Sequence, residues 1–258
     1  MKFQFEKYQG TGNDFVMIDH RQPFLVDLSI EQIAHICHRR FGIGADGFIL
    51  IEDDPEVDFK MVYFNSDGRE STMCGNGGRC SVMFAYTLGI IGTENIVFRA
   101  IDGLHHARIE GEIVHLGMND VDSISEKIQG IWLDTGSPHH VEVVEDVDDY
   151  PVHKKGRIIR NEIYGVEGSN VNFIEWQEDR LKVRTYERGV EAETYSCGTG
   201  VTASAIAVHH LKIVDKDSIA VSTPGGDLRV SFTFNDGVYS NVVLAGPAQK
   251  VFEGSWID

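Results

Sequence analysis

Two cysteines stand in the same short context at two distant places in the chain. Cys74 precedes Gly-Asn-Gly and Cys197 precedes Gly-Thr-Gly, and a run typical of a helix follows each motif, 78–88 and 201–211. A thiol beside glycines at a helix start lies among backbone N–H groups at the positive end of the helix dipole. This setting lowers the pKa of a thiol, and the same N–H groups can bind a carboxylate. Cys74 and Cys197 are therefore candidate catalytic residues.

Two such corners that face one small anionic molecule would place a base on one side of it and an acid on the other. Such a pair can remove a proton from a carbon and return one to the opposite face, which inverts the stereocentre. The α-hydrogen of an amino acid is very weakly acidic, so a site without a cofactor has to stabilise a carbanion-like species. Helix N-termini aimed at the carboxylate, in a dry and closed cleft, would do so.

The other two of the four cysteines are predicted to be core thiols. Cys37 falls on the apolar face of a helix expected from Ser29, the start of a capping box, to about Arg39. Cys80 lies within the helix that follows Cys74. The chain has no Cys-x-x-Cys pair, and its eleven histidines lack metal-binding spacing, so we expect no metal site.

The length, composition and charge of the chain exclude some classes of protein. The chain has 258 residues, a length that allows one large domain or two of ordinary size. Its hydrophobic share of 42% is enough to build a core. A formal net charge of −17 argues against binding to nucleic acid or to an anionic membrane, although a small carboxylate ligand stays compatible with it. The sequence has no apolar run of membrane-spanning length and no signal-peptide pattern at its start, so we expect a cytoplasmic protein.

The two halves of the chain resemble each other beyond the cysteines. Glycine, asparagine and phenylalanine mark a turn at 12–15 and recur at 168–173, and a strand leads to Asn65 before Cys74 as another leads to Glu187 before Cys197. We read an internal duplication. The predicted fold class is α+β: two similar, pseudo-symmetric domains, each a curved and mostly antiparallel sheet or barrel around a central helix, with the active site in the cleft between them. A polar stretch at 117–125 is the predicted boundary.

These segments together resemble the diaminopimelate epimerase family, in order from the first ten residues to the tail. Proline racemases and isomerase-like relatives share the two-corner plan without the Glu-Arg-Gly segment. The segments that match the two catalytic motifs are 73–80 and 186–189 with 193–200, and those that match substrate-binding segments are 12–15, 64–68 and 169–173.

The resemblance implies an isomerase that needs no pyridoxal phosphate or other cofactor. It would interconvert L,L- and meso-2,6-diaminopimelate for lysine and peptidoglycan synthesis, with Cys74 and Cys197 as the acid/base pair and His139 and Glu187 supporting the reacting centre near the α-amino group. The carried-over contacts to the distal amino-acid end are Asn13, Asn65, Asn170, Glu187 and Arg188. Those to the reacting α-carboxylate are the backbone N–H groups of Gly75, Asn76, Gly198 and Thr199.

The resemblance also assigns the tail to the first domain. The implied domains are 1–117 with 248–258, carrying Cys74, and 118–247, carrying Cys197. The expected partner is a small-molecule substrate, with no nucleic acid and no membrane, and a homodimer stays open.

Three positions depart from the family pattern. Ser137 stands where an asparagine is common before Pro-His, and Gly47 stands where some members have a glutamine that contacts substrate. The stretch between Arg188 and Cys197 is one residue longer than in many members, near Glu191-Ala192. The loop at 189–196 bears on substrate scope.

Other functions fit parts of this pattern. One is a related amino-acid racemase or isomerase, similar to proline racemase, with another substrate. Another is a non-catalytic amino-acid-binding protein, which has no need of two reactive cysteines. A cysteine hydrolase fits less well, because it would use one nucleophile with a histidine partner and form an acyl intermediate.

Overall fold

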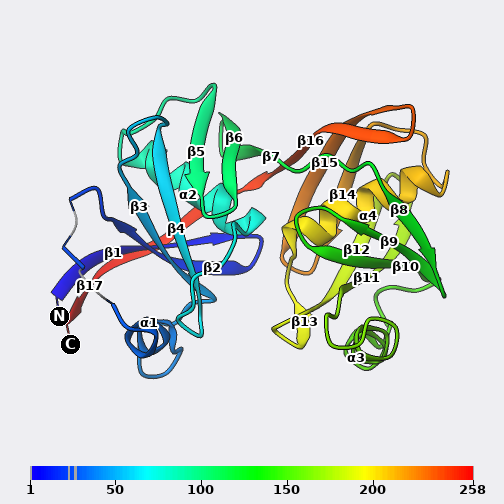
Figure 1. Cartoon of the computed structure of the whole chain (residues 1–258), viewed down its shortest axis with the longest axis horizontal. Helices are drawn as coiled ribbons and strands as arrows, with labels where there is room; N and C mark the ends of the chain where they lie inside the picture. Colours follow the sequence, from blue (N-terminus) through cyan, green and yellow to red (C-terminus); the bar gives the residue numbers. More distant parts are fainter. Residues whose placement is uncertain (1, 23, 26–27, 258) are drawn as a thin grey trace. The chain divides into compact units, whose positions relative to one another are not determined.

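A computed structural model describes residues 2–22, 24–25 and 28–257, and the parts of the predicted first domain at 1, 23, 26–27 and 258 lie outside this description. The chain groups into two compact units, Met1–Leu116 with Gly246–Asp258, and Gly117–Ala245 (Figure 1). In the described residues, no helix is long and apolar enough to cross a membrane.

In the described residues, the first unit is a sheet of eight strands with a central helix against one face. Its strands, in spatial order, are β17 (Gln249–Ile257), β1 (Lys2–Gly10), β2 (Asn13–Asp19), β3 (Gly47–Glu52), β4 (Phe59–Asn65), β5 (Ile96–Ala100), β6 (Gly103–Glu110) and β7 (Ile113–Gly117). The β2–β3 and β4–β5 pairs are parallel and the other pairs are antiparallel.

Both faces of this sheet are covered, because its central strands carry near-continuous apolar runs whose successive side chains point to opposite faces. Val16 and Phe48 pack with α1 (Ile30–Cys37) in one cluster. Phe15 and Ile49 point to the opposite face, toward Gly77 of α2 (Gly75–Thr87). The capping box expected at Ser29 is present, and it opens α1 where the sequence predicted a helix.

The second unit repeats this plan. Its strands are β8 (Ile124–Lys127), β9 (Gly130–Asp134), β10 (Pro138–Val143), β11 (Asn170–Gln177), β12 (Arg180–Glu187), β14 (Ser218–Thr223), β15 (Gly226–Asn235) and β16 (Val238–Pro247), with the short β13 (Ala192–Thr194) along the end of β12. One face packs on α4 (Gly198–His210) and the other on α3 (Val152–Glu162).

The order of parallel and antiparallel pairs is the same in both units. Two parallel pairs are separated by an antiparallel one, β2–β3–β4–β5 in the first unit and β10–β11–β12–β14 in the second. The buried helix enters after β4 in one unit and after β13 in the other. The fold class predicted from the internal duplication, two similar α+β units each with a mostly antiparallel sheet around a central helix, is confirmed.

The structure differs from the sequence analysis in two local features. The central helices begin at Gly75 and Gly198, three residues earlier than the predicted starts at 78 and 201, so the glycines form the first helical turn and each cysteine is the N-cap residue. The helix α3 was missed, because only Val152, Gly156 and Ile159 face the core among polar neighbours. Gly156 is required there, since a Cβ would lie 2.3 Å from Cβ of Tyr186.

Candidate functional site

The first cysteine corner lies where the loop after β4 enters α2. Cys74 has extended backbone angles (φ −94°, ψ 130°), so the helix starts at the next residue, and its side chain is half-buried. The N–H groups of the first helical turn have no acceptor within the helix, and they therefore suit an anion. The thiol and this anion-binding turn come from consecutive residues.

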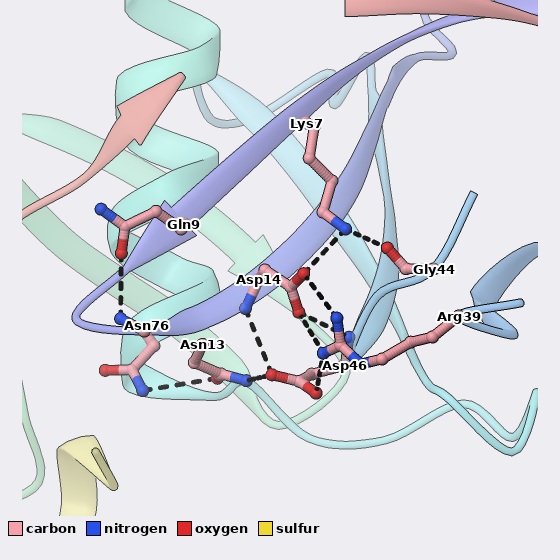
Figure 2. A network of polar contacts seen from close by, with 9 residues as sticks. Lys7, Gln9, Asn13, Asp14, Arg39, Gly44, Asp46 and Asn76 are labelled. Carbon is pink, nitrogen blue, oxygen red and sulfur yellow. Dashed lines mark hydrogen bonds and ion pairs between the residues drawn. The ribbon is translucent and has the colours of Figure 1, made fainter. Parts of the chain in front are cut away.

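Asn13, the first residue of β2, lies beside the Cys74 thiol. Its Oδ1 is 3.6 Å from Cys74 Sγ and accepts a hydrogen bond of 3.4 Å from Asn76 Nδ2. Its Nδ2 donates to Asp46 Oδ2 at 2.7 Å (Figure 2). A carboxylate can only accept hydrogen bonds, so Asp46 fixes which end of the Asn13 amide faces the thiol.

Two cations, the buried Lys7 and the exposed Arg39, hold Asp46 and its neighbour Asp14 (Figure 2). Arg39 Nη2 lies 2.7 Å from Oδ1 of each carboxylate, and Lys7 Nζ lies 2.8 Å from Asp14 Oδ2 and donates to the Gly44 carbonyl. Burial alone would raise the pKa of Asp14, but hydrogen bonds from Arg39 and Lys7 outweigh it and lower that pKa to about 2. The Asp14 carboxylate is therefore ionised at neutral pH.

The second cysteine corner repeats the first at the start of α4. Cys197 is again an extended N-cap residue (φ −118°, ψ 111°), and its thiol is buried. Cys197 Sγ lies 3.5 Å from Thr199 Oγ1, and Thr199 Oγ1 lies 2.9 Å from His139 Nε2. The Thr199 carbonyl accepts a hydrogen bond from Thr135 at 2.9 Å.

A buried chain of hydrogen bonds fixes His139 in one tautomer. Asn172 Nδ2 donates to His139 Nδ1 at 3.1 Å and to the His140 carbonyl at 2.9 Å, while Asn172 Oδ1 accepts from the Thr185 hydroxyl at 2.9 Å. His139 Nδ1 is therefore an acceptor, and Nε2 carries the proton that is donated to Thr199. Burial, followed by the positive charge of Arg188, lowers the pKa of His139 to about 3, so the imidazole is neutral.

The end of β12 and the loop after it hold the predicted Glu-Arg pair. The Arg188 N–H donates to Asn170 Oδ1 at 2.8 Å, and Arg188 Nη1 donates to the Glu167 carbonyl at 3.0 Å. Glu187 is half-buried at the last position of β12. In the loop after Arg188, Glu191 adopts a positive φ of 58° and accepts hydrogen bonds from Arg160 and from the Tyr186 hydroxyl, which hold this loop in place.

Asn65, a predicted site residue, and Gly47, one of the positions that depart from the family pattern, lie at neighbouring strand ends. Asn65 ends β4, and it lies opposite Gly47 on β3. A Cβ on Gly47 would lie 2.5 Å from the Tyr63 ring and 2.9 Å from the Phe64 carbonyl. The backbone and Tyr63 fill this space, which explains why no larger residue stands there.

The structure thus gathers the predicted residues within each unit. Asn13, Cys74 and Asn76 are in contact in the first unit; in the second, Cys197, Thr199 and His139 form one group and Asn170 and Arg188 another. The sequence did not point to Asp46 or Thr185. Asn172 did carry a signal, because it follows Asn170 at the two-residue period that places both side chains on one face of a strand.

The other two cysteines have no chemical role in this arrangement. Cys37 packs in the core cluster under α1 and Cys80 is fully buried in α2. Burial raises the pKa of each thiol to about 12, so both stay protonated and unreactive at neutral pH. The prediction that they are core thiols is confirmed.

Sequence comparisons with known proteins point to one family. The sequence profile described as diaminopimelate epimerase matches residues 5–119 and 131–251. A diaminopimelate epimerase of Flavobacterium psychrophilum is 49% identical over 96% of this chain and 97% of its own, and one from Aquifex aeolicus is 42% identical over 97% and 96%. Among solved structures, a PhzF-family phenazine biosynthesis protein of Bacillus anthracis covers all of both chains with a TM-score of 0.77 at 14% identity. A hydroxyproline epimerase of Agrobacterium vitis has a TM-score of 0.70 at 15% identity, covering 99% of this chain and 91% of its own. At such identities these two structures support the fold alone.

Proposed function

Because the chain belongs to the diaminopimelate epimerase family, we propose that it is an isomerase that interconverts L,L- and meso-2,6-diaminopimelate. One observation carries the proposed chemistry. The same corner, a cysteine N-cap followed by a glycine-rich first turn, stands at the start of the central helix in two units of the same topology. Inversion at carbon by a two-base mechanism needs one thiol on each face of the substrate.

In the proposed reaction, the first-turn N–H groups of α2 and α4 bind the reacting α-carboxylate. One of Cys74 and Cys197, as a thiolate, takes the α-proton, and the other, as a thiol, donates a proton to the opposite face. The carboxylate carries the negative charge that develops between the two transfers, and the N–H groups stabilise it there. The protons balance, because one thiolate gains a proton and one thiol loses a proton. The proposal therefore requires no oxidant, metal or cofactor.

The two corners present their thiols differently. Cys74 lies beside an amide oxygen, which accepts a hydrogen bond and cannot donate one. Cys197 lies beside a hydroxyl that already receives the His139 proton, which leaves the Thr199 hydrogen able to point to the sulfur. A hydroxyl donor stabilises a thiolate, so we assign Thr199 that support, with His139 and Asn172 acting behind it. The role of His139 near the α-amino group, which the family resemblance implies, stays a prediction.

The distal end of the substrate is a second amino-acid group, and we propose that the carried-over set binds it: Asn13, Asn65, Asn170, Glu187 and Arg188. Charge supports this assignment, because Arg188 suits a carboxylate and Glu187 an ammonium group. The backbone bond from Arg188 to Asn170 supports a shared role for these two residues. Asn13 also contacts Cys74, so we expect its substitution to affect the reacting centre as well.

We also propose that the two units are the two epimerase domains, with the tail belonging to the first, as the pairing of β17 with β1 supports. The biosynthesis of lysine and peptidoglycan precursors in the cytoplasm is the setting that this activity implies.

Proton NMR in D2O tests the function directly. The reduced protein, without pyridoxal phosphate, is incubated with L,L-diaminopimelate, and loss of the α-proton signal together with appearance of the meso isomer is expected. Folded, reduced protein that exchanges no α-proton of diaminopimelate would contradict the proposal. Exchange of proline or hydroxyproline under the same conditions would then favour the related racemase, and binding without exchange would favour the binding protein.

A further inference from the structure

One buried cation near the first cysteine corner has no role in the reaction described so far. Arg79, in the second turn of α2, is fully buried, with 0% of its surface exposed. Its Nη1 donates to the Gly75 carbonyl at 3.2 Å, and its Nη2 donates to Asn76 Oδ1 at 3.0 Å. Both partners belong to the turn proposed to bind the reacting carboxylate.

The other partners of this guanidinium are also neutral. Nη2 donates to Thr11 Oγ1 at 3.2 Å, and Nε lies 3.5 Å from the Pro247 carbonyl. In the described part of the chain, no carboxylate forms an ion pair with Arg79. Burial lowers the pKa of Arg79, but an arginine remains charged inside proteins. A buried charge without a counter-charge is strongly unfavourable, so an anion is expected near it when the protein works.

The protein's own groups supply few candidates for this anion. The thiols of Cys80 and Cys74 are the acidic groups whose charge would act on Arg79. Cys80 stays protonated, because burial raises its pKa to about 12. A cation near a helix N-terminus also opposes the helix dipole, so helix stability does not explain Arg79. The anion is therefore expected at the Cys74 corner itself.

The second corner shows what Arg79 adds. Thr202 stands at the equivalent position, five residues after Cys197, and its hydroxyl donates to the Gly198 carbonyl at 3.0 Å, as Arg79 does to Gly75. A hydroxyl is therefore enough to hold this carbonyl. Arg79 has two further features, a contact to the Asn76 side chain and a positive charge. Gly10 makes room for both, since a Cβ there would lie 3.4 Å from Nη2 and 3.2 Å from the Asn76 carbonyl.

We propose that Arg79 is a positioning residue that holds Asn76 in place and supplies a buried positive charge for a carboxylate bound at the start of α2. The proposal deepens the proposed function, because the carboxylate is that of the reacting amino acid. The neutral hydrogen bonds fix the guanidinium behind the first turn, where its charge adds to the dipole of the helix instead of forming a direct contact. The first corner would thus bind the carboxylate more strongly than the second.

Two alkylating reagents that differ in charge test this inference without turnover. Iodoacetate carries a carboxylate and iodoacetamide is neutral, and both alkylate a thiolate. The rate of each at Cys74 is followed by tandem mass spectrometry in the reduced, full-length protein, and the ratio of the two rates reports the local preference for a carboxylate. This ratio cancels any general change in thiol reactivity, which a merely structural role of Arg79 would cause.

Arg79→Met is expected to lower the iodoacetate-to-iodoacetamide ratio by about fivefold to tenfold, the loss expected for one nearby charge in a partly screened site. Arg79→Lys keeps the charge and is expected to retain most of the ratio. Arg99→Met removes an arginine that pairs with Asp54 and Glu56, and it should leave the ratio unchanged. If Arg79→Met does not fold, Arg79→Gln removes the charge while keeping hydrogen-bonding capacity.

An unchanged ratio in a folded variant without the charge at position 79 would overturn the inference. An equal fall in both rates is such a result, because it leaves the ratio unchanged. The alkylation needs no diaminopimelate, so its outcome is separate from that of the proposed function. A protein that fails to exchange diaminopimelate yet prefers iodoacetate through Arg79 would refute the substrate and keep the carboxylate site.

Discussion

Asn13 donates a hydrogen bond of 2.7 Å to the carboxylate of Asp46 and thereby turns its amide oxygen toward Cys74. The carboxylate cannot donate, so the opposite orientation of the amide would place two acceptors against each other. Asp46 is in turn held by Arg39 at 2.7 Å. A residue that does not touch the thiol thus decides whether an acceptor or a donor faces it.

We expect Asp46→Ala to lower kcat by about tenfold, since a lost hydrogen bond that orients a neighbour costs roughly 1–3 kcal/mol. Asp46→Asn can still accept from Asn13 through its amide oxygen, so its kcat should fall between those of the alanine variant and the wild type. Steady-state rates of L,L-to-meso conversion measure both effects.

Asp19→Ala is the matched control, because Asp19 also pairs with an arginine, Arg21, at 2.7 Å, away from the corner. Its kcat should equal that of the wild type. Equal activity in Asp46→Ala and Asp19→Ala would show that Asp46 does not orient the site.

Cys74→Ala and Cys197→Ala should each abolish epimerisation, a loss of more than about 10³-fold, because each removes one of the two proton-transfer groups. Both variants should remain folded by circular dichroism. Conversion is measured by the NMR assay, and wild-type turnover in either variant would exclude the two-base mechanism. Cys37→Ala is the control: it should lose stability by about 1 kcal/mol through a lost core contact and keep its turnover per folded molecule.

The sequence predicted those parts of the structure that short local motifs encode. The Cys-Gly-x-Gly repeat predicted the corners, and the capping box at Ser29 predicted α1. The helix starts at Gly75 and Gly198 were missed, because glycine has a low helix propensity and only the packing of the buried turn overrides it.

Contacts between residues distant in sequence were the part that the sequence could not reveal. Asp46 reaches Asn13 across 33 positions and Asn172 reaches His139 across the same number, through parallel strand pairs whose register no local pattern encodes. Arg79 belongs to the matched segment 73–80, but its burial could not be predicted, because it depends on packing against residues distant in sequence.

Acid should destabilise the protein through two buried histidines. Burial lowers the pKa of His139 to about 3 and of His140 to about 4, against about 6.5 in the unfolded chain. Between these values the unfolded state binds more protons, so stability falls as the pH decreases below about 6.5, by up to about 1.4 kcal/mol per pH unit for each histidine. Above pH 6.5 this contribution is complete.

Urea unfolding between pH 5 and pH 7 measures this dependence, in a range above the titration of most carboxylates. His140→Gln should reduce the slope by up to about half, because one of the two most strongly shifted histidines is gone; His115, whose pKa is also lowered by burial and by Arg108, contributes to the remainder. The exposed His106→Gln is the control and should keep the full slope. A pH-independent free energy of unfolding in the wild type would refute the burial of neutral imidazoles.

Alanine substitutions at the equivalent glycines of the two corners should differ in cost. In the second corner, a Cβ on Gly200 would lie 2.4 Å from Asn172 Oδ1, and the Asn172 amide is held by three hydrogen bonds and cannot move aside. In the first corner, a Cβ on Gly77 would lie 3.3 and 3.4 Å from the ends of Ile49 and Met61, and at an ordinary contact distance of 3.5 Å from the Phe15 ring. Flexible apolar ends can shift by a few tenths of an ångström, whereas a fixed amide cannot.

We therefore expect Gly200→Ala to lower the free energy of unfolding by about 1–3 kcal/mol, the usual cost of overpacking, and Gly77→Ala to lower it by less than about 1 kcal/mol. Gly200→Ala should also reduce kcat, because the displaced Asn172 would release His139 and hence Thr199. Gly92→Ala, at a position with nothing within 4 Å, is the neutral control for both measurements. Equal destabilisation at Gly77 and Gly200 would mean that the amide of Asn172 is not fixed by its partners, and the support assigned to His139 through it would then fail.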